Sequence, residues 1–192
     1  IGADPTILPR ANDIVVCMYA GGYSAVVDLS KYFHNFKTKA SERQWLGTIH
    51  PVTNIMYEYF GLPMGSSNSP AIACRIGQGF LRLLRSRYKV FQGRGRANCY
   101  WTGFTELGYD PARGYGFIME NCNGLTVQVW GFVDDFLIHG PTHQIVTEAL
   151  HAFLDTACRV GFLCHPKKCV APCQSLQYIG FVFDTTGHPT LK

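Results

Sequence analysis

Residues 125–139 read Leu-Thr-Val-Gln-Val-Trp-Gly-Phe-Val-Asp-Asp-Phe-Leu-Ile-His, and this stretch decides the fold of the chain. Its first half alternates β-forming residues, and its second half is a short apolar run that stops at Gly140-Pro141. Two such strand patterns separated by a short polar break predict a β-hairpin. The break holds Asp134 and Asp135, so the predicted tight turn carries two adjacent carboxylates.

Two adjacent acids between apolar strands are costly, because each carboxylate raises the pKa of the other unless a cation lies nearby. A divalent metal ion is the usual solution, and carboxylate oxygens suit Mg²⁺ or Mn²⁺. Taken alone, the motif is better explained by an Asp-Asp turn that faces solvent. A third acid in a similar setting favours the metal site.

Asp28 is that third acid. It follows the apolar run of residues 23–27, which Gly21-Gly22 precedes, and we expect a strand over residues 25–29. An Asp at the end of one strand and an Asp pair on a neighbouring hairpin can share two cations. Two metal ions held about 4 Å apart stabilise the attacking and leaving oxygens of an in-line phosphoryl displacement.

Two helices are predicted. Residues 61–70, Gly-Leu-Pro-Met-Gly-Ser-Ser-Asn-Ser-Pro, form a turn-rich entry to a helix over residues 71–88. Free backbone N–H groups at such a Gly-containing entry let a nucleotide approach closely. The second helix runs from Thr142, a predicted N-cap, to Arg159, with Gly161 as its C-cap. Residues 178–191 are predicted to form a closing hairpin.

Strand, helix, hairpin, helix and strand in this order predict an α+β fold, an antiparallel β-sheet backed by helices. Residues 30–60 and 88–124 read as possible insertions. The second is basic, glycine-rich and aromatic, which suits nucleic-acid binding through phosphate contacts and base stacking. An exposed insertion with no such role is the alternative.

The composition fits one folded domain: 192 residues, 47% apolar and 14% aromatic. The net charge of +4 is compatible with a polyanionic partner and does not demand one. The eight cysteines are expected to be reduced core residues, because the chain shows no signal-peptide pattern. A zinc site is the rival explanation for the cluster of Cys164, His165, Cys169 and Cys173, although its spacing is not that of a zinc knuckle.

With these residues in view, the chain resembles the reverse transcriptases, whose motifs A to E it matches in order. They are residues 26–33 (motif A, first catalytic Asp at Asp28), 62–71 (motif B), 132–135 (motif C, Phe132 replacing the common Tyr), 161–169 (motif D) and 176–182 (motif E, the primer grip). Within this family, the residues of the motifs resemble those of long-terminal-repeat retrotransposons and their relatives most. The long link of residues 87–125 resembles DIRS-like or pararetroviral lineages.

The resemblance implies RNA-directed DNA synthesis by two-metal nucleotidyl transfer, within a retroelement pol polyprotein. It implies a polymerase palm-type antiparallel β-sheet over residues 1–192, a single domain with part of the fingers and no thumb. Implied partners are an RNA or DNA template with primer, dNTPs and further pol domains such as fingers, thumb and RNase H. An intracellular location and no membrane contact are expected. A truncated, non-catalytic relative that binds nucleic acid or a subunit is the alternative.

The resemblance also assigns roles to residues. Asp28, Asp134 and Asp135 are expected to hold two Mg²⁺ or Mn²⁺ ions, with a partly structural role for Asp135. Lys168 is expected to protonate the leaving group, with Lys167 as the second choice.

The remaining roles concern the nucleotide and the primer. The Leu29 carbonyl is expected beside the nucleotide-side metal, and Met64 and Gly65 beside the nucleotide. Phe33 is expected to exclude a ribose 2′-hydroxyl, with Tyr32 as the alternative gate. Tyr178, Ile179 and Gly180 are expected to hold the primer end.

Overall fold

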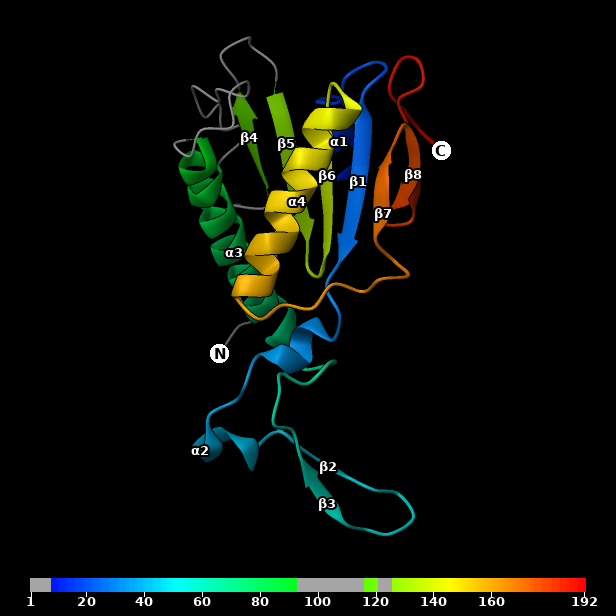
Figure 1. Ribbon diagram of the computed structural model, residues 1–192. Helices are drawn as coiled ribbons and strands as arrows, with labels where there is room; N and C mark the ends of the chain where they lie inside the picture. Colours follow the sequence, from blue (N-terminus) through cyan, green and yellow to red (C-terminus); the bar gives the residue numbers. More distant parts are fainter. Residues whose placement is uncertain (1–7, 93–115, 121–125) are drawn as a thin grey trace.

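The fold is built on a five-stranded antiparallel sheet. The computed structural model describes residues 8–92, 116–120 and 126–192. The strand order is β4-β5-β6-β1-β7 (Figure 1), from β4 Gly116–Glu120, β5 Thr126–Phe132, β6 Asp135–Gly140, β1 Tyr23–Asp28 and β7 Val170–Cys173. The predicted antiparallel sheet is therefore confirmed. The hairpin of β5 and β6 and the strand β1 lie where the sequence placed them, whereas β4 was not expected.

Two helices, α3 Ser69–Gln92 and α4 His143–Arg159, cover one face of this sheet (Figure 1). Ala25 and Val27 of β1 share their core cluster. Val26, between them, belongs to a second cluster with Ile14 of the short helix α1 Ala11–Val15 and with residues of the C-terminal strands. Successive side chains of a strand point to opposite faces, so β1 is buried on both. This explains its unbroken apolar run.

Both predicted helices are confirmed. α3 begins two residues before the expected start and extends to Gln92. The backbone N–H of Ile145 donates to the Thr142 hydroxyl at 3.3 Å, which confirms Thr142 as the N-cap of α4. Gly161 follows the end of α4 with a φ of +83°, the left-handed conformation that glycine adopts most easily.

The C-terminal segment contains the predicted closing hairpin and one further strand. The hairpin is the antiparallel pair of β9 Phe181–Asp184 and β10 Thr190–Leu191, and β8 Ser175–Tyr178 adds to it to make a three-stranded sheet. A two-residue turn, Ile179-Gly180, with φ values of 45° and 86°, interrupts the expected first strand. Positive φ at both positions is the pattern of a type I′ turn, which the β-branched Ile179 conceals at the sequence level.

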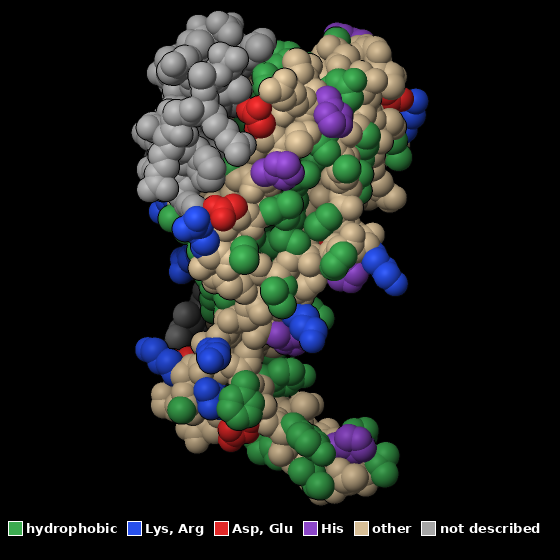
Figure 2. Space-filling view, in the orientation of Figure 1, with side chains coloured by type: hydrophobic (Ala, Val, Ile, Leu, Met, Phe, Trp, Pro, Cys, Tyr) green, Lys and Arg blue, Asp and Glu red, His purple; other side chains and the backbone are tan. Residues whose placement is uncertain are grey.

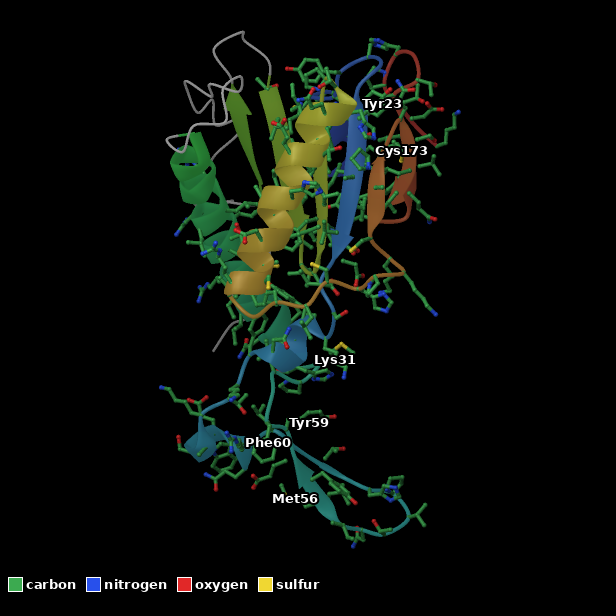
Figure 3. All side chains as sticks on the ribbon, viewed as in Figure 1. Tyr23, Lys31, Met56, Tyr59, Phe60 and Cys173 are labelled. Carbon is green, nitrogen blue, oxygen red and sulfur yellow. The ribbon has the colours of Figure 1, made fainter. Side chains whose placement is uncertain are left out.

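Residues 32–60 leave the sheet and form an arm (Figure 1). At the base of the arm, η1 Tyr32–Asn35 still packs into the core through Tyr32. Beyond it lie α2 Ala40–Arg43 and a ribbon of β2 Gly47–Ile49 and β3 Met56–Glu58. Every residue of the ribbon's two strands is exposed. Met56, Tyr59 and Phe60 lie along this arm in Figure 3, and Figure 2 shows hydrophobic side chains gathered on it. A bridge between Lys37 and Gly61 closes its base.

Part of the sequence interpretation lies outside the described residues. The basic, glycine-rich part of the 88–124 insertion falls on residues 93–115 and 121–125. Among the described residues, no helix combines the length and the apolar character needed to cross a bilayer.

Candidate active site

The two adjacent acids lie at the tip of the β5–β6 hairpin. Phe132 and Asp135 are cross-strand partners, which leaves Val133 and Asp134 as the two turn residues. Val133 has a φ of 59°, while Asp134 keeps a negative φ. A non-glycine residue in the left-handed region costs about 1–2 kcal/mol, so the turn is held in place by its surroundings.

Asp28 lies directly beside this turn. It pairs with Asp135 across β1 and β6, and the backbone N–H of Leu29 donates to the Asp134 carbonyl at 2.9 Å. The antiparallel register thus brings Asp28 to an acid pair that lies more than 100 residues further along the chain. The sequence offered this neighbourhood as a possibility, and the resemblance to reverse transcriptases implied it, but the residues alone did not prove it.

The acids repel one another in a half-buried setting. The pKa of Asp135 is raised to about 6, chiefly by burial. The charges of Asp134 and Asp28 and a hydrogen bond to the Asp28 side chain contribute to the same increase. Burial also raises the pKa of Asp134, and the charge of Asp28 adds to this increase. An environment that opposes ionisation of grouped carboxylates favours the arrival of a cation.

Lys168 supplies a positive charge at this place. Its Nζ atom lies 2.9 Å from Oδ2 of Asp28. The loop that carries it is fastened under β1: the backbone N–H of Ser30 donates to the Leu163 carbonyl at 2.7 Å, and that of His165 donates to the Asp28 carbonyl at 2.8 Å. Of the two candidate lysines, Lys168 makes the ion pair with Asp28.

The two candidate gate residues have different environments. Tyr32 is buried, and its hydroxyl donates to the Ala73 carbonyl of α3 at 3.0 Å. Phe33 is half-buried and packs edge-on against Tyr32. Of the two rings, Phe33 is therefore the one with an accessible surface. On the loop before α3, Met64 is 69% exposed and Gly65 has a φ of +92°.

The predicted primer-grip residues form the turn between β8 and β9. Tyr178 is buried, and its hydroxyl donates to the Asp135 carbonyl at 3.3 Å. Ile179 is half-buried and Gly180 is exposed. The turn is thus joined by a hydrogen bond to the acidic hairpin, a contact that the sequence pattern did not indicate.

The carboxylates fit a divalent cation by their chemistry, because Asp28 and Asp135 are cross-strand partners, Asp134 occupies the adjoining turn, and carboxylate oxygens suit Mg²⁺ and Mn²⁺. Among the described residues, no three His, Cys, Asp or Glu side chains are positioned to hold a metal ion without moving. This includes Cys164, His165, Cys169 and Cys173, the rival zinc cluster. Mg²⁺ or Mn²⁺ would be held by Asp28, Asp134 and Asp135.

One functional contact escaped the sequence interpretation. Gly77 of α3 lies against the site, and a Cβ atom there would lie 3.1 Å from the Tyr32 hydroxyl and 3.7 Å from the Val133 carbonyl. A glycine inside a helical pattern signals such close approach, but nothing in the sequence says what approaches.

The fold is similar to that of solved structures of foamy viral protease-reverse transcriptase. The complex with an RNA/DNA hybrid gives a TM-score of 0.64 at 15% identity over 97% of this chain and 19% of that chain. Two complexes with double-stranded DNA give 0.64 at 16% and 0.62 at 17%, each over 100% of this chain. The chain spans 25% and 30% of those two chains.

The sequence itself carries the family assignment. No curated protein matches the chain. The sequence model of the family described as reverse transcriptase (RNA-dependent DNA polymerase) matches residues 25–183. This match spans most of the chain and includes the three acids, Lys168 and the turn after β8. The chain belongs to the reverse transcriptase (RNA-dependent DNA polymerase) family.

Proposed function

We propose that this chain is the palm-centred domain of an RNA-directed DNA polymerase that uses two-metal nucleotidyl transfer. The observation that carries the proposal is the meeting of Asp28, Asp134 and Asp135 at one end of β1 and β6. We also propose a lineage for the chain: the residues of its motifs favour a retroelement pol polyprotein of the long-terminal-repeat or DIRS-like type.

Asp28 and Asp134 are the proposed ligands of both metal ions, and Asp135 supports them from the opposite strand. Bound Mg²⁺ or Mn²⁺ would lower the pKa of the primer 3′-hydroxyl and neutralise charge on the triphosphate. Lys168 carries its ammonium group at the edge of the same site and is the proposed proton donor to the leaving group. Most of the catalysis then comes from positioning and charge neutralisation.

The nucleotide is proposed to lie between the acids and the loop before α3. Leu29 follows Asp28 and its N–H donates to the Asp134 carbonyl, and its own carbonyl is the proposed group beside the nucleotide-side metal. Met64 and Gly65 lie on the exposed part of the loop before α3. The half-buried Phe33 ring would clash with a ribose 2′-hydroxyl and thereby favour dNTPs. Met64 contacts the nucleotide by packing, because its thioether is a weak hydrogen-bond acceptor.

Primer and template are proposed as the macromolecular partners. The turn of Tyr178, Ile179 and Gly180 would hold the primer end, since Tyr178 fixes it to Asp135. Residues 1–192 are proposed to act as one domain, with the arm of residues 32–60 as part of the fingers. Fingers, thumb and RNase H domains are proposed as neighbours in a longer pol product.

Primer extension tests the proposal. A DNA primer on an RNA template is incubated with the chain, Mg²⁺ or Mn²⁺ and dNTPs, in parallel with the variants Asp134→Asn and Asp155→Asn. Asp155 lies on α4 and pairs with Arg159, so its variant is the matched control. We expect extension by the wild type and the control and none by Asp134→Asn. Hybrid binding without extension in any protein would favour the non-catalytic alternative.

A further inference from the structure

The ammonium group of Lys168 lies at the acids although the residue belongs to none of the strands that carry them. It contacts Asp28 at 2.9 Å. The hydrogen bond and charge of Asp28 raise the pKa of Lys168, and the charges of Asp135 and Asp134 raise it further. All three carboxylates therefore stabilise the charge of this ammonium group.

The two partners differ in their freedom to move. The Asp28 side chain is 9% exposed and sits at the end of the central strand β1, whereas the Lys168 side chain is 62% exposed. The backbone of Lys168 is held, because its N–H donates to the His165 carbonyl at 3.0 Å. A flexible four-carbon stem on a fixed backbone can move its charge away from Asp28 at little cost.

The ion pair competes with metal binding. Oδ2 of Asp28 accepts the hydrogen bond from Lys168, and a divalent cation held between Asp28 and the Asp134-Asp135 turn would need the same carboxylate. An ammonium group and a divalent cation at that position would also repel each other.

We propose that Lys168 is a resident counter-ion of Asp28, which a divalent cation must displace on binding. The inference rests on the proposed function, since it takes Asp28 as a metal ligand. Lys168 thus lowers the affinity of the metal-free chain for the cation. Its displacement makes the ammonium group available to the incoming triphosphate only when the metal is present, so Lys168 couples metal binding to nucleotide binding.

Mn²⁺ binding to the full chain tests the inference without any measurement of activity. Free Mn²⁺ is followed by electron paramagnetic resonance in the wild type and in the variants Lys168→Met, Lys168→Arg, Lys167→Met and Asp134→Asn. Methionine keeps the length of the stem and removes the charge. We expect Lys168→Met to bind Mn²⁺ about three- to tenfold more tightly. Lys168→Arg should stay near the wild type, and Lys167→Met, which loses the neighbouring exposed charge, should change by less than about twofold.

The outcomes separate the two proposals. Equal Mn²⁺ affinity in the wild type and Lys168→Met overturns the inference and leaves the metal site standing. An equal gain in Lys167→Met also overturns it, because the effect would then follow net charge alone. Absence of Mn²⁺ binding in the wild type, or full binding in Asp134→Asn, overturns the metal site and the inference together.

A second measurement observes the displacement itself. Lysines are labelled by reductive ¹³C-methylation, which preserves their charge, and the Lys168 resonance is assigned by its absence from Lys168→Arg. Added Mg²⁺ should shift this resonance, because the contact with Asp28 is lost. A resonance that stays in place while Mg²⁺ saturates the chain overturns the inference.

Discussion

Asp28 and Asp135 are direct cross-strand partners in the antiparallel pair of β1 and β6, with like charges opposed at the end of the sheet. Such a pair destabilises the ladder that holds it. Lys168 and the possible protonation of Asp135 relieve the repulsion in the metal-free chain. The grouped acids therefore lower the stability of the metal-free chain, and the size of this effect depends on pH.

Asp135→Asn should stabilise the metal-free chain at pH 8 and have little effect near pH 3.5, below the pKa of 3.8 from which the carboxyl is raised. The pKa of Asp135 is about 6 in the folded chain and is raised from 3.8, so the folded state binds more protons between these values. Folding is then favoured as the pH falls through this window and penalised above it. Urea unfolding in EDTA should show a gain of about 1 kcal/mol at pH 8, reduced from the full shift because Asp135 is partly solvated.

Asp155→Asn serves as the control for that measurement, because Asp155 lies on the exposed side of α4. Equal responses of the two variants at both pH values would contradict a special role of the Asp28–Asp135 pairing.

His139→Gln should remove an acid sensitivity of the opposite sign. His139 is fully buried, its Nε2 accepts from the Tyr19 backbone N–H at 2.8 Å, and Nδ1 lies 2.8 Å from the Ser24 hydroxyl. Burial lowers its pKa from 6.5 to about 4. The unfolded chain therefore takes up the proton first, and stability is lost as the pH falls from about 6.5 towards 4, by about 2 kcal/mol between pH 7 and pH 5.

Because Asp135 acts in the other direction over part of this range, the comparison is best made in the Asp135→Asn background. The variant His188→Gln, at an exposed turn, is the matched control. A wild-type-like loss of stability in His139→Gln on acidification would rule out His139 as the cause.

Gly77→Ala and Gly79→Ala should differ although both lie in α3. A Cβ at Gly79 meets nothing within 4 Å, so alanine there should stabilise the chain by about 0.5–1 kcal/mol. A Cβ at Gly77 would approach the Tyr32 hydroxyl to 3.1 Å, and that hydroxyl is fixed by its bond to the Ala73 carbonyl. Thermal unfolding should rank Gly77→Ala below Gly79→Ala; the reverse order would show that Tyr32 yields easily.

Ile179→Asn should stabilise the turn between β8 and β9. Ile179 has a φ of 45°, where a β-branched residue is strained, while Asn followed by Gly is the preferred pair of a type I′ turn. We expect a net gain of about 1 kcal/mol after the loss of partial burial. Val182→Asn, the same polar change on strand β9, should destabilise. If both variants lose stability alike in urea, strain at Ile179 is not significant.

Phe33→Ala should weaken the discrimination between dNTPs and rNTPs, as measured by the ratio of their kcat/KM values in primer extension. Removal of the half-buried ring opens space for a 2′-hydroxyl. Tyr32→Phe should leave this ratio unchanged and cost about 1 kcal/mol of stability, because it removes the hydroxyl's bond to the Ala73 carbonyl. A changed ratio in Tyr32→Phe alone would identify Tyr32 as the gate.

Local sequence determined the elements that depend on local patterning. The alternation before Phe132 and the apolar run after Asp135 specified the hairpin, and Thr142 and Gly161 marked the ends of α4. β4 and the turn at Ile179 were missed. Ile179 is β-branched and disfavours the positive φ that it adopts in this turn, so the surrounding packing decided its conformation.

The sequence by itself determined the reverse transcriptase family and the motifs in which three acids and a lysine stand. Only the tertiary structure decided which groups touch: Asp28 opposite Asp135, Lys168 on Asp28, Tyr178 on the Asp135 carbonyl, and Gly77 beneath Val133. The physical reason is that strand register, helix approach and loop anchoring depend on contacts between residues far apart in the chain. Residue spacing along the chain does not encode these distances.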